Sequence, residues 1–189
     1  MSPTKLKLSS QQLQALNSGD ESVFKLLFLN YQPRLYRFFW LKIRSVELAE
    51  DLVQETFLRI WKTKNRIKND DNLDIYIFRI ASNLSIDVFR KKQRTKEFVP
   101  IDYDQLLDND QTEDLAQANQ LSQFIDKILT KLPENPRTSF LLSRNEGFSH
   151  VQIAEIMNIS VKTVEKHIGK ALNILRKELR KLGFLTAVG

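Results

Sequence analysis

Five side chains near the C-terminal end of the sequence share one face of a predicted helix and have the chemistry to bind DNA. They are Lys162, Thr163, Lys166, Lys170 and, at the margin of the face, His167. At about 100° per residue they lie opposite an apolar stripe that recurs every three or four residues from 161 to 182. Lysines bind phosphates, and hydroxyl or imidazole groups can contact base edges. A helix whose lysines are only solvated is the alternative interpretation.

The segment before this face has the signals of a helix-turn-helix. Ser149 and Gln152 form a capping box that predicts the start of a first helix. Asn158 tolerates the left-handed conformation of a tight turn, and Ile159 can fill the elbow. Ser160 can cap the second helix. Because the second helix of this motif enters the major groove, we favour DNA binding over a plain helical hairpin.

The composition favours helices and excludes several classes of enzyme. Of 189 residues 42% are hydrophobic, with only Gly 5 and Pro 5, which predicts an all-α protein. With Cys 0 and His 2, a thiol nucleophile is excluded and zinc lacks ligands. The sequence also has no Gly-rich phosphate-binding loop. We therefore expect no catalytic residues, no metal ion and no cofactor.

Membrane and export signals are absent from the sequence. No apolar run approaches the roughly 18 residues of a membrane span. The first residues, MSPTKLKLSSQQLQ, lack the apolar stretch of a signal peptide. We expect a cytoplasmic protein without membrane insertion.

The charge distribution predicts two basic domains joined by an acidic linker. The whole chain carries +6, yet residues 95–118 contain seven acidic residues against one lysine, a net charge of −6. The segment from 95 to 114 also lacks helical periodicity, so we expect it to be flexible. The predicted fold is therefore all-α, with small helical domains at 1–94 and 115–189.

The N-terminal domain contains a helix with an acidic outer face. Ser45 can cap this helix, whose apolar stripe runs through residues 49–61. Its opposite face carries a candidate protein-docking stripe formed by Asp51, Gln54, Glu55 and Leu58. From periodicity alone, a solvated helix with one stray leucine is the favoured interpretation.

A third helix, from about 72 to 94, has a stripe suited to single-stranded DNA. Away from its apolar face lie Tyr76, Arg79, Asn83 and Arg90. An aromatic ring can stack on a base, asparagine can contact a base edge, and arginine binds phosphate. An amphipathic helix with a buried tyrosine is equally compatible with these residues.

Three stretches together resemble bacterial sigma factors of the extracytoplasmic-function (ECF) group. They are residues 49–58 (AEDLVQETFL), residues 76–83 (YIFRIASN) and residues 153–164 (IAEIMNISVKTV). All three occur in the order and spacing of that family, and the resemblance covers about residues 20–94 and 115–182. The helix-turn-helix alone is shared by many regulators, whereas the combination is specific.

The resemblance implies two helical domains, region two and region four, that give core RNA polymerase its choice of promoter. Asp51, Gln54 and Glu55 fall in the segment that docks on the polymerase, which reverses the preference for a solvated helix. Asn83 falls beside the pocket for a flipped base of the minus-ten element, and the loop at 63–72 falls where that base is selected. The helix from 161 corresponds to the reader of the minus-thirty-five element.

The resemblance also implies partners. The pattern is closest to the iron-uptake-like subgroup of Bacteroidetes, which suggests an anti-sigma factor in addition to core RNA polymerase and promoter DNA. Where the family often has tryptophan, this chain has Ile75-Tyr76-Ile77, so base stacking would fall to Tyr76. The main alternative is a stand-alone helix-turn-helix regulator with an N-terminal sensing or dimerisation domain, which would not need an acidic docking stripe.

Overall fold

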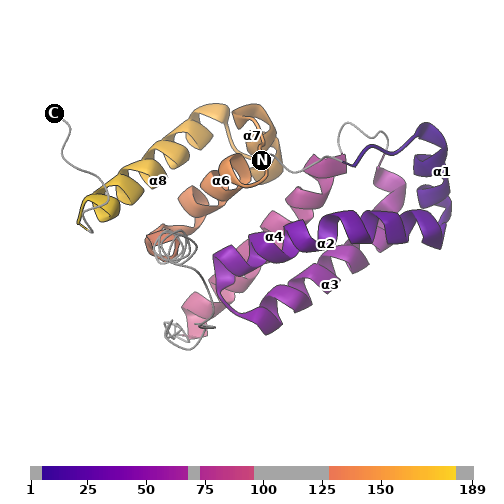
Figure 1. Cartoon of the computed structure of the whole chain (residues 1–189), viewed down its shortest axis with the longest axis horizontal. Coiled ribbons are helices and arrows are strands. Elements are labelled where there is room, and N and C mark those ends of the chain that lie inside the picture. Colours follow the sequence, from indigo (N-terminus) through magenta and orange to yellow (C-terminus); the bar gives the residue numbers. More distant parts are fainter. Residues whose placement is uncertain (1–5, 68–72, 96–127, 182–189) are drawn as a thin grey trace, which may run out of the picture.

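The computed structural model describes residues 6–67, 73–95 and 128–181, in which helices are joined by short turns (Figure 1). The helices are α1 (Ser10–Ser18), α2 (Glu21–Ile43), α3 (Val46–Thr63), the 3-10 helix η1 (Lys64–Arg66), α4 (Leu73–Thr95), α6 (Glu134–Arg144), α7 (His150–Met157) and α8 (Val161–Lys181). No strand occurs in the described ranges, and the prediction of an all-α fold is confirmed.

The long helices α2, α3 and α4 pack against one another as an N-terminal bundle. Asp20 caps α2 by accepting hydrogen bonds from the backbone of Ser22 and Val23, and the Ser45 hydroxyl caps α3 as predicted. The sequence left open whether Pro33 divides the first pattern into two helices. In the structure Pro33 lies inside the single helix α2.

Helix α1 is an element that the sequence analysis missed. Ser9 and Gln12 form a capping box at its start, and Gly19 ends it in the left-handed conformation with φ 90°. Leu13 and Leu16 are buried, so α1 closes one end of the bundle. The serine and glutamine three residues apart were the signal that could have predicted this helix.

Buried aromatic rings hold the N-terminal bundle together. Tyr31 and Phe39 of α2 and Phe78 of α4 are fully buried. Phe38 meets Phe78 edge to face, with ring centroids 5.7 Å apart and an interplanar angle of 86°. Edge-to-face contacts stabilise such a core by about 0.5–1.5 kcal/mol beyond burial, which gives α4 a fixed place against α2.

The predicted helix-turn-helix is confirmed in α7 and α8. Ser149 and Gln152 exchange both hydrogen bonds of the capping box, and Asn158 ends α7 in the left-handed conformation with φ 53°. The Ser160 hydroxyl accepts a hydrogen bond from the backbone of Thr163 at 3.1 Å. The turn between the helices is therefore specified by local hydrogen bonds.

Two predictions fall largely outside the described residues. The predicted acidic linker lies there except for Thr95, the last residue of α4. Of the helix predicted from 115 to 132, the structure describes its last residues, where 128–131 are helical before Pro133. No helix in the described ranges combines the length and apolarity needed to cross a bilayer.

Candidate functional site

Three of the four residues predicted to bind single-stranded DNA meet at one cavity of about 470 Å³. The cavity lies where the end of α3, η1 and the first half of α4 come together. Its lining is Arg59, Lys62, Thr63, Arg66, Tyr76, Arg79, Ile80 and Asn83. Four of these side chains are cationic and none is acidic. Arg59 and Arg79 each also pair with a glutamate that does not line the cavity. The lining is thus net positive and suits an anionic ligand.

Tyr76 and Asn83 present different groups to this cavity. The Tyr76 ring is half-buried, and its hydroxyl donates a hydrogen bond to the Thr63 carbonyl oxygen at 3.1 Å. This bond fixes the ring as part of the cavity wall. Tyr76 is therefore neither a fully exposed ring for base stacking nor a fully buried core tyrosine, the two interpretations of the sequence. Asn83 is exposed, so its amide is free to meet a ligand.

Three cations of the cavity were missed by the sequence analysis. Arg59 and Lys62 lie one turn apart near the end of α3, and Arg66 follows in η1. Arg59 also forms an ion pair with Glu55, with 2.7 Å between Nε and Oε1. The spacing of these cations, three residues and then four, was visible in the sequence, but only the packing of α3 on α4 brings them to Asn83.

Arg90, the fourth predicted residue, lies elsewhere. It is seven residues beyond Asn83 on α4, a separation of about 10 Å along the helix axis. Arg90 lines a second cavity of about 620 Å³ between α4, α6 and α8. Most of the predicted duplex-binding face lines this cavity too, through Thr163, Lys166, His167 and Lys170.

The second helix of the helix-turn-helix, α8, carries its lysines close together. Val164, Ala171 and Leu175 bury the opposite side of the helix. The pKa of His167 is lowered by burial and then by the positive charges of Lys166 and Lys170, so the ring is neutral at pH 7. The positive charge of this face therefore comes from its lysines, a residue type that binds phosphate.

The outer face of α3 combines acidic and apolar groups. Asp51 and Gln54 are exposed, and Leu58 is 53% exposed. Glu55 keeps 43% of its side chain exposed despite its pair with Arg59. An exposed leucine among acids is a surface suited to a basic protein partner with an apolar pocket. In the described part of the chain, no group of three or more His, Asp or Glu side chains could hold a metal ion.

The two halves of the chain match two conserved domains of known proteins. Residues 27–95 match Sigma-70 region 2, and residues 123–175 match Sigma-70, region 4. The ECF RNA polymerase sigma factor SigW of Bacillus subtilis is 30% identical over 181 residues, which cover 91% of this chain and 97% of that protein. The chain belongs to the ECF sigma factor family. It acts in promoter-specific initiation of transcription, and a stand-alone regulator is not favoured.

A second ECF sigma factor is similar in sequence, and two solved structures share the fold. The ECF RNA polymerase sigma factor SigE of Mycolicibacterium smegmatis is 29% identical, over 92% of this chain and 66% of that protein. The fold is shared with CnrH, solved in complex with the cytosolic domain of CnrY, at a TM-score of 0.69 and 23% identity, over 90% of this chain and 96% of that one. It is also shared with RpoE of Bartonella quintana, solved in complex with the anti-sigma factor NepR. That comparison has a TM-score of 0.68 and 24% sequence identity, and it covers 83% of this chain and 96% of that one.

Proposed function

We propose that this sigma factor docks on core RNA polymerase through α3, holds a minus-ten base at the cavity beside Asn83 and recognises the minus-thirty-five element through α8. The proposed domains are 1–94 and 115–189, with 95–114 as the linker. The observation that carries the proposal is the convergence of Tyr76, Arg79 and Asn83 on one cation-lined cavity of about 470 Å³. The sequence alone does not show that these three residues lie beside Arg59, Lys62 and Arg66.

The cavity has the groups that a flipped nucleotide requires. Its arginines and lysine can neutralise the phosphates on either side of a base, and the Tyr76 ring offers an aromatic surface. The Asn83 amide has both a donor and an acceptor for the edge of a base. Such a site binds a base only after the strands separate, which assigns it to promoter opening.

The N-terminal half of α8 is suited to duplex DNA. Lys162, Lys166 and Lys170 lie at four-residue spacing and therefore follow one side of the helix. Thr163 sits in the first turn, where recognition helices approach base edges. We assign Lys162, Thr163, Lys166, His167 and Lys170 to the minus-thirty-five element.

We also propose the setting in which the protein works. CnrH and RpoE of Bartonella quintana were each solved with a second protein, which for RpoE is an anti-sigma factor, and we propose an anti-sigma partner here. The iron-uptake-like subgroup of Bacteroidetes remains our proposal for its relatives. The sigma factor acts in the cytoplasm, with no catalytic residues and no cofactor of its own.

Transcription from purified components tests the proposed function. Core polymerase with this protein should start transcripts at a discrete set of sites in a genomic promoter pool, whereas core polymerase alone should start none of them. The start sites should share two short sequence elements upstream. If core polymerase started transcripts at the same sites with and without the protein, the proposal would be contradicted.

The salt dependence of DNA binding tests the α8 assignment. Lys166→Ala should weaken binding of the reconstituted holoenzyme to duplex promoter DNA, and should flatten the slope of log K against log salt by about one unit. A phosphate contact behaves this way because its neutralisation releases counterions. The measurement is the binding constant at several salt concentrations, before strand opening.

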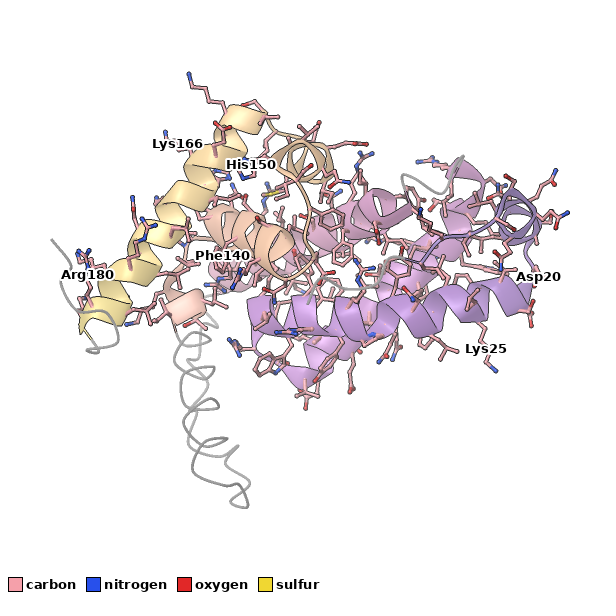
Figure 2. The ribbon with its side chains drawn as sticks, turned by 45° about the horizontal axis from the view of Figure 1, so that its top comes forward. Asp20, Lys25, Phe140, His150, Lys166 and Arg180 are labelled. Carbon is pink, nitrogen blue, oxygen red and sulfur yellow. The ribbon has the colours of Figure 1, made fainter. Side chains whose placement is uncertain are left out.

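Lys25→Ala is the matched control for this measurement. Lys25 is an exposed lysine of α2, far from Lys166 in Figure 2. Its removal changes the net charge equally but should leave the slope unchanged. Equal slopes for Lys166→Ala and the wild type would remove Lys166 from the DNA contacts.

A further inference from the structure

Helix α8 contains a glycine, Gly169, that no close contact within the protein requires. Gly169 is exposed, and α8 continues past it to Lys181. Apart from its two chain neighbours and the nearby backbone of α8, no heavy atom of the described residues lies within 4 Å of a Cβ atom placed on Gly169. An alanine would therefore fit at this position without a clash.

Backbone conformation does not require a glycine at this position either. Gly19 and Gly147, the other glycines in the described ranges, have φ of 90° and 70°. Residues with a Cβ atom rarely adopt this left-handed conformation, so both positions favour glycine. Gly169 has no positive φ and lies within the regular part of α8.

A glycine in the interior of a helix is destabilising. Alanine in its place favours the folded helix by about fivefold, because alanine loses less backbone entropy on folding. Gly169 is eight residues from the first residue of α8 and twelve from the last, so it caps neither end. The sigma factor thus has a destabilising residue at an exposed position of the helix that we assign to duplex DNA.

Gly169 lies on the lysine-bearing face of α8. It is seven residues after Lys162 and three after Lys166, spacings that place residues on one side of a helix. Lys170 follows Gly169 directly, and Asn173, four residues after it, is exposed. The face therefore has a gap without a side chain, bordered by lysines and one amide.

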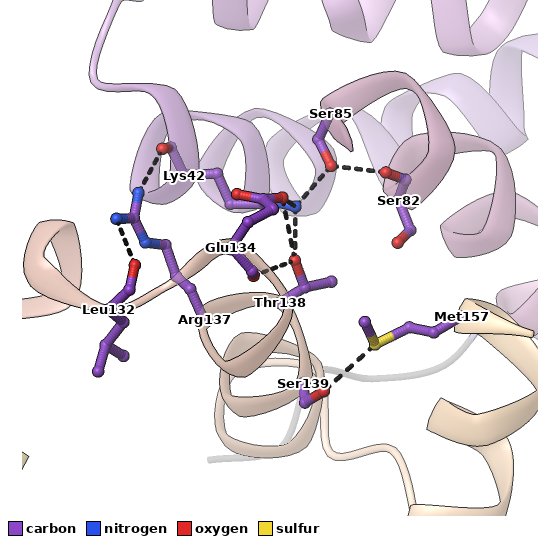
Figure 3. Close-up of polar contacts among 9 residues, drawn as sticks. All are labelled: Lys42, Ser82, Ser85, Leu132, Glu134, Arg137, Thr138, Ser139 and Met157. Carbon is purple, nitrogen blue, oxygen red and sulfur yellow. Dashed lines mark hydrogen bonds and ion pairs between the residues drawn. The ribbon is translucent and has the colours of Figure 1, made fainter. Parts of the chain in front are cut away.

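Packing on the other side of α8 fixes the direction in which Gly169 faces. The buried Ser139 of α6 donates a hydrogen bond from its hydroxyl to the Met157 sulfur of α7 at 3.3 Å (Figure 3). The same hydroxyl oxygen lies 3.3 Å from Nδ1 of His167 on α8. Ala171 of α8 is fully buried as well. One serine thus links α6, α7 and α8, and Gly169 is left facing solvent.

The major groove leaves little room around an inserted helix. An α-helix with its side chains is about 10–12 Å across, and the major groove of B-DNA is about 12 Å wide. A position without a Cβ atom lets the helix backbone come closer to the base pairs on that side. A glycine at the centre of the inserted face would therefore allow deeper insertion.

We propose that Gly169 sets the depth at which α8 lies in the major groove of the minus-thirty-five element, and that it is thereby a specificity-determining position. The proposal rests on the assignment of α8 to duplex DNA. The backbone of α8 at Gly169 lies against the edges of the base pairs. This close approach brings the short side chain of Thr163 within reach of a base.

Contacts to bases depend on this depth more than contacts to phosphates do. The Thr163 hydroxyl lies 2.8 Å from that of Ser160, so it reaches a base only if the helix backbone is close. A hydrogen bond needs about 2.5–3.2 Å between donor and acceptor, and a shift of about 1 Å breaks it. Lysine has a flexible four-carbon stem that can follow a phosphate through such a shift. An added methyl group should therefore weaken sequence recognition and spare the phosphate contacts.

Gly169→Ala tests the proposal because stability and DNA binding should change in opposite directions. The melting temperature of the free protein should rise by about 2–4 °C, because alanine is the better helix former. The reconstituted holoenzyme should lose about tenfold in affinity for a duplex that carries the minus-thirty-five element and ends before the minus-ten element. This loss is within the range expected for one base pair of a site.

The same duplex with its minus-thirty-five element scrambled separates sequence recognition from phosphate binding. Gly169→Ala should change the affinity for this duplex by less than about twofold, and the slope of log K against log salt should match the wild type. Gly169→Leu introduces a larger side chain that also favours helices. It should weaken binding to the intact element more than Gly169→Ala does.

Gly19→Ala is the matched control. Gly19 ends α1, which lies far from α8 in Figure 1, and its φ of 90° makes an alanine there strained. The melting temperature should fall, whereas the affinity for both duplexes should match the wild type. A change in stability alone would thus be distinguished from a change in DNA recognition.

Wild-type affinity of Gly169→Ala for the intact element would overturn the role of Gly169. Equal losses on the intact and the scrambled element would also overturn it, because sequence recognition would then be unaffected. Lys166→Ala distinguishes these results from a failure of the proposed function. A salt slope unchanged by Lys166→Ala would contradict the assignment of α8 to DNA, whereas a flattened slope together with wild-type binding by Gly169→Ala would overturn only the role of Gly169.

Discussion

Replacing Asp51 and Glu55 with lysine should lower the affinity of the sigma factor for core polymerase by at least about tenfold, or about 1.4 kcal/mol. Both carboxylates reach solvent on α3, beside the exposed Leu58. Reversing two charges turns attraction to a basic surface into repulsion, which costs more than removing them. Titration of labelled protein with core polymerase, in the absence of DNA, gives the affinity.

The same double variant should keep its fold. Asp51 is exposed, and Glu55 makes one exposed pair with Arg59, a kind of contact worth about 0.3–0.5 kcal/mol within a helix. Surface changes of this kind usually alter stability within about 0.5 kcal/mol. Glu165→Lys with Glu178→Lys changes the net charge equally on α8 and should leave the affinity unchanged. Unaltered binding by the Asp51 and Glu55 variant would remove α3 from the docking surface.

Asn83→Ala should slow promoter opening about tenfold or more and leave the closed complex intact. A base-edge contact of this type is worth about 1–3 kcal/mol, and it forms only when the strands have separated. Asn83 carries no charge, so the initial contact with duplex phosphates does not depend on it. Because Asn83 is exposed and alanine favours helices, α4 should remain folded.

A promoter with a pre-melted bubble over the minus-ten element separates binding of the unpaired base from initial binding of the duplex. Asn83→Ala holoenzyme should bind the intact duplex as the wild type does, bind the bubble more weakly, and open the duplex more slowly. Gln32→Ala removes an amide from an exposed position of α2 and should match the wild type in all three measurements. If Asn83→Ala holoenzyme bound both templates and opened the duplex as the wild type does, Asn83 would not be the residue that binds the unpaired base.

The sequence determined the elements whose signals are local. Ser149, Gln152, Asn158 and Ser160 specify the helix-turn-helix through bonds that span at most a few residues, and such bonds form whatever the rest of the chain does. The lysine-bearing face of α8 follows from helical periodicity in the same way. Helix α1 had an equally local capping box and was missed because its apolar stripe is short.

Which distant side chains meet depends on how the helices pack. Arg59 belongs to the cavity of Asn83 because α3 packs against α4, where the Tyr76 hydroxyl is hydrogen-bonded to the Thr63 carbonyl oxygen. Arg90 lies about two helical turns farther along α4 and lines the other cavity. Lys42 would be expected at the surface from its residue type, because lysine is almost never buried without a partner. It is buried because α6 brings Glu134 to it from another part of the chain. Contacts of this kind depend on packing over long sequence separations, which no periodicity or cap encodes.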